Sequence, residues 1–180
     1  PVYVYYPLMA TVPQEAAADT RNRSHTITAH VDVPAAGAEG VLLAMGSRFG
    51  GYTLFVKDCR LVYEYNYLNR ERFVVTSTRE VPAGAHRLGV RFTKTGERQG
   101  EATLLIDDAP AGAGPVPRTI PARYSFSGGL DCGHDAGSPV SEAYTSPFAF
   151  TGTIDKIVVE LETGAAAVTA ADARAALGRE

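Results

Sequence analysis

The side chains best equipped for chemistry lie close together in residues 131–141, whose sequence is DCGHDAGSPVS. Asp131 and Asp135 carry hard carboxylate oxygens of the kind that Ca²⁺ prefers, and backbone carbonyls of such a loop could supply further ligands. The alternative is that both carboxylates accept hydrogen bonds from nearby backbone N–H groups and so close turns. We favour this second interpretation, because the spacing is far from that of a dedicated calcium loop such as an EF-hand.

His134 is the one histidine that stands in a motif with nearby carboxylates. Its neighbour Asp135 does not by itself complete a catalytic triad, and neither serine of the segment lies in a Gly-x-Ser-x-Gly elbow. We therefore keep His134 as a candidate ligand-binding residue and assign no catalytic residue. The other histidines, His25, His30 and His86, lie far apart in the sequence, and we expect structural roles for them.

A group of tyrosines forms a second candidate binding feature. Tyr63 and Tyr65 share one face of a predicted strand over residues 61–67, and Tyr52 is placed across a hairpin from them. Aromatic rings on an exposed strand face can stack on a sugar or an aryl group. The same pattern is also typical of the packed inner face of a sandwich, or of a surface docked on a neighbouring domain. Both interpretations remain open, although the absence of tryptophan weighs against a sugar platform.

The elements that must position these side chains are strands. Residues 24–33 alternate between apolar and polar side chains, which is the pattern of a strand with one buried face. The same criteria, with β-branched and aromatic enrichment, predict strands over residues 24–33, 52–56, 61–67, 72–76, 86–92, 102–106 and 153–161. Arg87 and Arg91 are expected to face water, and the Gly- and Pro-rich segment after Asp107 and Asp108 is expected to be a loop.

Strands that recur about every 10–15 residues favour a sandwich over a parallel α/β sheet. We predict an all-β antiparallel β-sandwich of the jelly-roll or concanavalin-like kind, with one domain over residues 1–162. Residues 163–180 are predicted to form a short C-terminal helical tail. Within that tail, Thr169 and Asp172 are spaced like a capping pair, and Gly178 is placed like a helix stop.

The hairpin between residues 52–56 and 61–67 contains a misfit in its turn. Its central pair is Asp58 and Cys59, and a type I′ turn requires a positive φ at both central residues. Cysteine carries a Cβ that is unfavourable in this conformation, at a cost of roughly 1–2 kcal/mol. We therefore predict that replacing Cys59 with glycine stabilises the protein.

Composition narrows the class of protein. Of the 180 residues, 45% are hydrophobic and 21% are charged, which is typical of a globular domain and not of a disordered chain. The net charge is −3 without runs of like charge, so we expect neither a nucleic-acid nor a membrane partner. The chain begins at Pro1 without a secretory signal, and we expect it to be a piece of a longer protein.

Cysteine usage gives a modest indication of the compartment. Only Cys59 and Cys132 are present, which is too few for a disulfide framework or a thiolate metal site. A single bridge between them is one possibility. We favour two free thiols and a reducing, cytoplasmic compartment over a periplasmic or secreted one.

Several motifs in fixed order resemble a known enzyme family. They are YVYYP at residues 3–7, VPQEAA at 12–17, GGYTLFVKD at 50–58, LVYEYN at 61–66 and the segment from Asp131 through PFAFTGTI at 147–154. In this order they resemble the C-terminal region of bacterial arylsulfatases of the formylglycine-dependent type. The resemblance covers most of residues 1–161 and is strongest over 46–67 and 131–161. The family usually has glycine where this chain has Cys59.

The resemblance implies a non-catalytic accessory domain that packs against a sulfatase catalytic domain of the same polypeptide. That catalytic domain would carry Ca²⁺ and a formylglycine formed within a C-x-P-x-R type motif. Neither cysteine of this chain has Pro at +2 and Arg at +4, so we expect no cofactor here and no sulfate-ester hydrolysis by this chain alone. An accessory role also predicts an uncovered apolar face, around residues 3–7 and the tyrosine strand.

Two other functions compete with the accessory role. The alternative is a carbohydrate-binding, lectin-like module that uses exposed tyrosines, with Tyr52, Tyr63, Tyr65 and His134 as ligand-binding residues. A self-contained enzyme that cleaves aryl sulfates is the least favoured, because the motif is missing.

Overall fold

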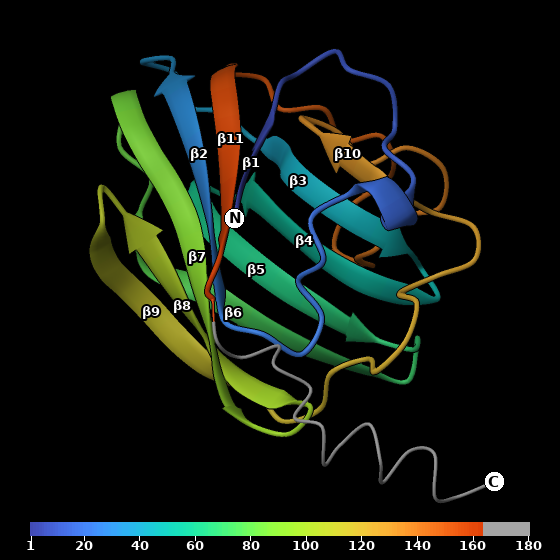
Figure 1. Cartoon of the computed structure of the whole chain (residues 1–180). Coiled ribbons are helices and arrows are strands. Elements are labelled where there is room, and N and C mark those ends of the chain that lie inside the picture. Colours follow the sequence, from blue (N-terminus) through green and yellow to red (C-terminus); the bar gives the residue numbers. More distant parts are fainter. Residues whose placement is uncertain (164–180) are drawn as a thin grey trace, which may run out of the picture.

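Two antiparallel sheets pack face to face in the computed structural model, which describes residues 1–163 (Figure 1). The six-stranded sheet has the order β1 (Val2–Tyr5), β11 (Thr153–Leu161), β2 (His25–Val33), β7 (Gly84–Gly96), β8 (Gln99–Ile106) and β9 (Ala109–Val116). The five-stranded sheet has the order β10 (Leu130–Cys132), β3 (Gly40–Ser47), β4 (Gly50–Lys57), β5 (Arg60–Tyr67) and β6 (Glu71–Glu80). A short 3₁₀ turn, η1 (Gln14–Ala16), lies between β1 and β2.

The predicted all-β antiparallel sandwich is confirmed. The predicted C-terminal helix falls outside the described residues. Within residues 1–163, no helix is long and apolar enough to cross a bilayer.

The main core lies between the two sheets and is built by alternation along each strand. In β2, Ile27 and Ala29 point inward and are fully buried, while Thr28 and His30, which alternate with them, point outward. The facing strands contribute large inward side chains such as Leu54 and Tyr63. Each fully buried large apolar side chain contributes about 1.5–3 kcal/mol through removal of apolar area from water.

The sequence analysis did not predict four strands, β1, β3, β9 and β10. For β3 and β9 the reason can be identified. Val41 to Met45 in β3 are buried on both faces of the sheet, so the strand reads as a continuous apolar run without alternation. The segment after Asp107 and Asp108, predicted to be a loop, instead forms β9. This strand lies at an edge of its sheet, where proline is tolerated because one side of the strand needs no donors.

The β4–β5 turn adopts the strained conformation that the sequence predicted. Asp58 has φ 51° and Cys59 has φ 62°, and Lys57 pairs with Arg60 on either side. Cys59 is exposed and Cys132 is buried, and both are free thiols. Burial raises the pKa of the Cys132 thiol to about 12, so this thiol stays protonated and unreactive at neutral pH.

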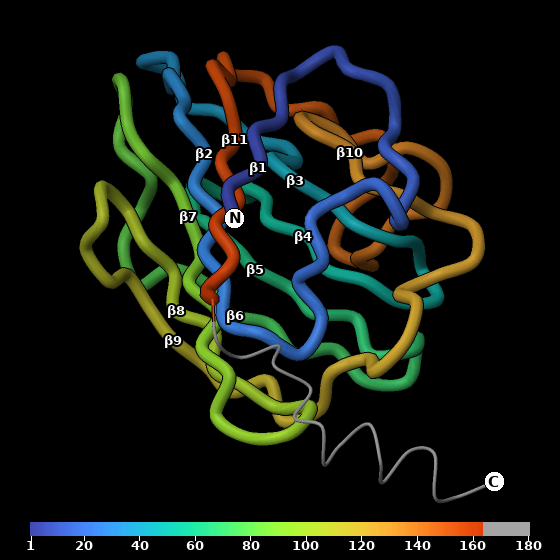
Figure 2. The backbone as a smooth tube through the Cα atoms, in the orientation of Figure 1, coloured from blue at the N-terminus to red at the C-terminus, as the bar shows by residue number. Residues whose placement is uncertain are grey.

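A second, smaller core covers the outer face of the five-stranded sheet. Residues 133–150, termed the covering segment, follow β10 in the chain (Figure 2) and pack against side chains of β3, β4 and β5. Tyr144 packs edge-on against Phe55 at 5.1 Å between ring centroids, and Val140 is fully buried beside them. The outer faces of the two sheets therefore differ, because residues 133–150 cover one of them, whereas no segment within residues 1–163 covers the other, here termed the open face.

Candidate functional site

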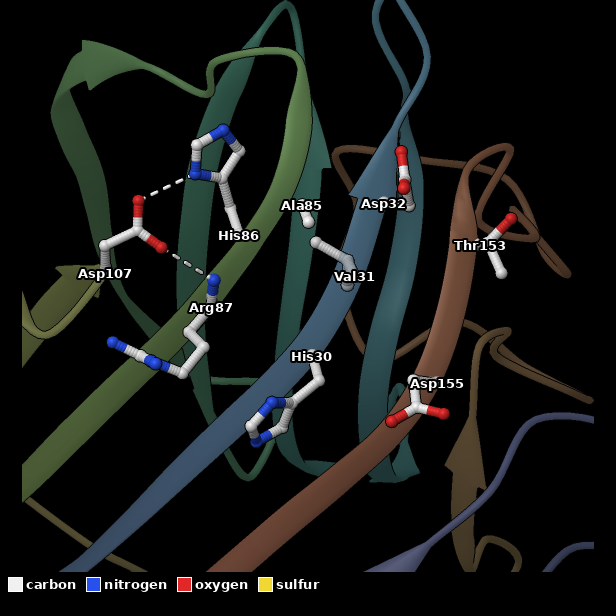
Figure 3. A pocket seen from close by; sticks show the side chains of 9 residues that line it. All are labelled: His30, Val31, Asp32, Ala85, His86, Arg87, Asp107, Thr153 and Asp155. Carbon is white, nitrogen blue, oxygen red and sulfur yellow. Dashed lines mark hydrogen bonds and ion pairs between the residues drawn. The ribbon is translucent and has the colours of Figure 1, made fainter.

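An open depression of about 390 Å³ lies at one end of the six-stranded sheet, where β2 ends and β7 and β11 begin (Figure 3). Its polar lining is contributed by β2, β7, β11 and the β8–β9 turn, and consists of His30, Asp32, His86, Arg87, Asp107 and Asp155. Val31, Ala85 and Thr153 complete the lining. A volume of this size falls within the range of small-ligand sites, roughly 300–1,000 Å³.

Strand alternation brings the first polar groups together. Because Val31 points into the core, His30 and Asp32 on either side of it point outward. Antiparallel register then places His30 opposite Arg87 on β7, and Asp32 opposite Thr153 on β11. Directly paired side chains lie about 5 Å apart at Cβ, so the group is compact although its members are distant in sequence.

Asp155 joins the depression through a β-bulge. The β11–β2 register shifts between Ile154 and Lys156, which leaves Asp155 as the extra, unpaired residue. Such a bulge turns a side chain out of the regular alternation, and Asp155 is exposed at the edge of the depression.

Some of the lining groups are already engaged with one another. The Asp107 carboxylate accepts hydrogen bonds from the His86 ring at 2.7 Å and from the Arg87 backbone N–H at 2.9 Å. The hydrogen bond with Asp107 raises the pKa of the His86 imidazole above its ordinary value. The Arg87 guanidinium is paired with Asp108, at 2.7 Å from Nη2 to Oδ2. These contacts fix the rim of the depression next to β7.

Three ionisable lining side chains have no partner within the described protein. Among the described residues, no hydrogen bond or ion pair involves the side chains of His30, Asp32 or Asp155. Two carboxylates and an imidazole therefore face the depression without being bound to another protein group. The carboxylates of this arrangement can accept hydrogen bonds from a hydroxyl-rich ligand, and the imidazole can both donate and accept hydrogen bonds.

Of the interpretations of the tyrosines, the packed inner face of the sandwich is confirmed and the exposed binding platform is wrong. Tyr52, Tyr63 and Tyr65 are at most 3% exposed, because this strand face is the inner face of the sandwich. They form an aromatic cluster with Tyr124, and the Tyr65 hydroxyl accepts a hydrogen bond from the Ile120 N–H at 2.7 Å. Burial raises the pKa of each of the three well above its ordinary value. They stabilise the core and cannot stack on a sugar from solvent.

Asp131 and Asp135 accept hydrogen bonds from nearby backbone N–H groups, as the turn-closing interpretation predicts. Asp131 accepts from the Ala136 N–H at 2.9 Å, and Asp135 accepts from the Val140 N–H at 2.9 Å. Within residues 1–163, no group of three or more histidine, cysteine or acidic side chains is arranged to hold a metal ion. The geometry therefore gives no support to the calcium interpretation.

Asp135 is distinctive because it is only 1% exposed. Its Oδ2 accepts from the Tyr144 hydroxyl at 2.6 Å, while its Oδ1 is buried without a partner in the described residues. Burial, the largest cause, raises the pKa of this carboxyl to about 6. Asp135 thus acts within the covering segment and does not reach the open depression.

His134 lies in a second depression, of about 600 Å³, between the N-terminal segment and the start of β11. Its Nδ1 is 3.2 Å from the Cys132 carbonyl oxygen, and its Nε2 is 3.8 Å from Asp131. The rest of the lining is mainly apolar and includes Leu8 and Phe150. The structure therefore groups His134 with Asp131, and the lining of this depression includes none of the three tyrosines.

Sequence reasoning missed His30, Asp32, His86 and Asp155 as site residues. A partial signal existed, because the alternation in residues 24–33 places His30 and Asp32 outward. The missing information was strand pairing, which joins β2 to β7 and β11 across more than fifty intervening residues.

Comparison with known proteins reveals a shared fold. No protein-family model matches the chain, and no curated protein matches it in sequence. The CBM40 of the Ruminococcus gnavus IT-sialidase bound to α2,6-sialyllactose is similar in structure, with a TM-score of 0.56 and 10% identity over 88% of this chain and 91% of that one. The same CBM40 bound to α2,3-sialyllactose gives a TM-score of 0.52 and 9% identity over 78% and 76%.

A further structural neighbour is the mouse laminin α1 chain, domains LG4-5, with a TM-score of 0.52 and 12% identity over 89% of this chain and 39% of that one. Identities this low establish the common β-sandwich and leave function to be argued from the site.

Proposed function

We propose that this chain is a carbohydrate-binding module whose site is the depression formed by β2, β7 and β11. The observation that carries the proposal is the presence of three ionisable side chains without a partner in the described residues, His30, Asp32 and Asp155, around an open volume of about 390 Å³. The fold is shared with sialidase carbohydrate-binding modules, which supports the same conclusion.

The chemistry of the lining suits sugar hydroxyls. A carboxylate only accepts hydrogen bonds, whereas a neutral imidazole donates from one nitrogen and accepts at the other. Adjacent hydroxyls of a pyranose can donate to Asp32 and Asp155 and can exchange hydrogen bonds with His30. The site therefore relies on polar contacts from sheet residues and not on the tyrosines that sequence reasoning proposed.

A glycan array probed with the wild-type chain tests this proposal. We expect binding to a subset of oligosaccharides, and we expect Asp32→Asn and His30→Ala each to weaken it by about tenfold or more, since each removes a hydrogen bond made in a ligand site. Glu101→Gln is the matched control, because Glu101 is exposed on β8 of the same sheet but does not line the depression. Absence of any glycan signal, or equal losses in the control, would contradict the proposal.

A second candidate function is supported by a separate surface. Four residues of the N-terminal segment are unusually exposed for apolar side chains, namely Val2 at 65%, Val4 at 42%, Tyr6 at 56% and Leu8 at 99%. β1 is an edge strand, so its outer edge is unpaired in the described part of the chain. The resemblance to arylsulfatases leads us to propose a neighbouring catalytic domain as the partner of this surface.

The reading frame upstream of Pro1 tests the accessory role. We expect it to encode a catalytic domain with a C-x-P-x-R or S-x-P-x-R segment. A frame that lacks such a domain would contradict the accessory role and leave carbohydrate binding unaffected.

A further inference from the structure

We infer that the depression selects uncharged sugars and rejects acidic ones, an inference that rests on the carbohydrate-binding function proposed above. The reason is the balance of charge around the depression. Three carboxylates line it, those of Asp32, Asp107 and Asp155, against a single guanidinium, that of Arg87.

The one guanidinium that lines the depression is already paired with a carboxylate. Arg87 extends to Asp108, and its Nη2 lies 2.7 Å from the Asp108 carboxylate. His86 is held in the same way by Asp107, at 2.7 Å, with its other ring nitrogen 2.8 Å from the Ala83 carbonyl oxygen. Arg87 and His86 are therefore neutralised by their own neighbours. Two further cations lie close by without lining the depression: Lys156 pairs in register with His30, and Arg79 donates to the Ile106 carbonyl oxygen beside Asp107.

Two carboxylates remain without a counter-charge. Asp32 and Asp155 reach the depression from adjacent strands and make no ion pair within residues 1–163 (Figure 3). The carboxylate of an acidic sugar placed here would meet like charges, while Arg87 and His86, the cationic groups of the lining, are already paired with carboxylates. This arrangement disfavours binding. Sugar hydroxyls are donors, and these two side chains accept hydrogen bonds from them without any such penalty.

This preference differs from that suggested by the structural neighbours. The Ruminococcus gnavus modules are bound to sialyllactose, an acidic trisaccharide. Lactose and sialyllactose differ in the acidic residue, so they make a matched pair of probes for the effect of charge. Further pairs consist of neutral oligosaccharides on an array and the same oligosaccharides capped with sialic acid.

The experiment measures binding of both members of each pair to the wild-type chain, first on the array and then by isothermal titration calorimetry. We expect each neutral probe that binds to do so at least about tenfold more tightly than its sialylated counterpart, the size of effect that one uncompensated charge contact produces. Asp155→Asn is expected to weaken binding of the neutral probe, with Glu101→Gln as the control.

Asp108→Asn supplies a complementary test. Asp108 has φ 66°, a conformation that asparagine tolerates, so the turn should be retained. The substitution frees the Arg87 guanidinium. We therefore expect the ratio of the Kd of the sialylated probe to the Kd of the neutral probe to fall by about threefold or more.

The outcomes separate the two proposals. Tighter binding of sialylated than of neutral probes, with loss of binding in Asp155→Asn, would overturn the charge inference while leaving carbohydrate binding in place. No binding of any probe would overturn both. A preference for neutral probes that Asp108→Asn does not change would show that Arg87 is not the missing cation, and would overturn the role assigned to its ion pair.

Discussion

The two outer faces of this sandwich use their polar residues in opposite ways. On the five-stranded sheet, Glu64 is 4% exposed and accepts hydrogen bonds from Arg72 and Ser141, both at 2.9 Å. On the six-stranded sheet, Asp32 and Asp155 are exposed and have no partner in the described chain. The polar groups of the covered face hold the covering segment in place, whereas those of the open face stay available.

This contrast indicates where a ligand can bind. A buried polar group without a partner is costly, so the groups under the covering segment must be satisfied within the protein. An exposed carboxylate is satisfied by water and can exchange that water for a ligand at little cost. The open face is therefore the face on which polar residues can serve binding without loss of stability.

The largest expected difference in stability between the two faces comes from removing an arginine side chain from each. Arg72→Ala leaves the Glu64 carboxylate buried and unpaired, so we expect the free energy of unfolding to fall by about 3 kcal/mol. Arg87→Ala on the open face breaks an exposed ion pair and should cost less than about 1 kcal/mol. Urea denaturation of both variants measures the two losses. Equal losses would mean that the covering segment does not isolate Glu64 from water.

Asp135 should give the covered face a pH dependence. The pKa of its carboxyl is raised to about 6 in the folded protein, against about 3.9 in an unfolded chain. Between these pH values the folded state binds more protons than the unfolded state. The contribution of Asp135 to stability is therefore fully present below about pH 4 and is lost as pH rises through about 6, by up to about 3 kcal/mol.

Asp135→Asn should remove this decline. The measurement is the free energy of unfolding of both proteins from pH 4 to pH 7. If the free energy of unfolding of the variant falls with pH as steeply as that of the wild type, the pH dependence belongs to another group.

A smaller effect on stability is expected at the β4–β5 turn, which belongs to neither outer face. Cys59→Gly relieves a positive φ of 62° at an exposed position and should stabilise the protein by about 1 kcal/mol. A thermal melt measures this gain, and Cys59→Ser, which keeps the Cβ, is the matched control. A lower melting temperature for the glycine variant would mean that the Cys59 side chain makes a stabilising contact.

The smallest change in stability is predicted for a substitution on the open face. Asp32→Asn should change the free energy of unfolding by no more than about 0.5 kcal/mol, because the side chain is exposed and contacts no partner in the described residues. Together with a clear loss of glycan binding, this result would separate function from stability at one residue. A large loss of stability would place Asp32 in the framework of the fold.

The fold was more predictable than the site, for physical reasons. Alternation identified β2 and gave the bounds of β11, and the turn chemistry of Asp58 and Cys59 was readable because it is local. The location of the tyrosines stayed open because alternation shows that a strand has two faces but not which face is covered. Asp155 could not be foreseen, since its bulge depends on register with another strand.

Two-dimensional NMR would locate a bound sugar on the protein directly. The isotopically labelled chain is titrated with the neutral oligosaccharide that gives the strongest array signal. If the open face is the binding face, the largest shifts of backbone amides will fall on residues 30–32, 85–87 and 153–155, with little change in the covering segment. Shifts centred on residues 133–150, or a failure of every array probe to bind, would contradict carbohydrate binding at this depression.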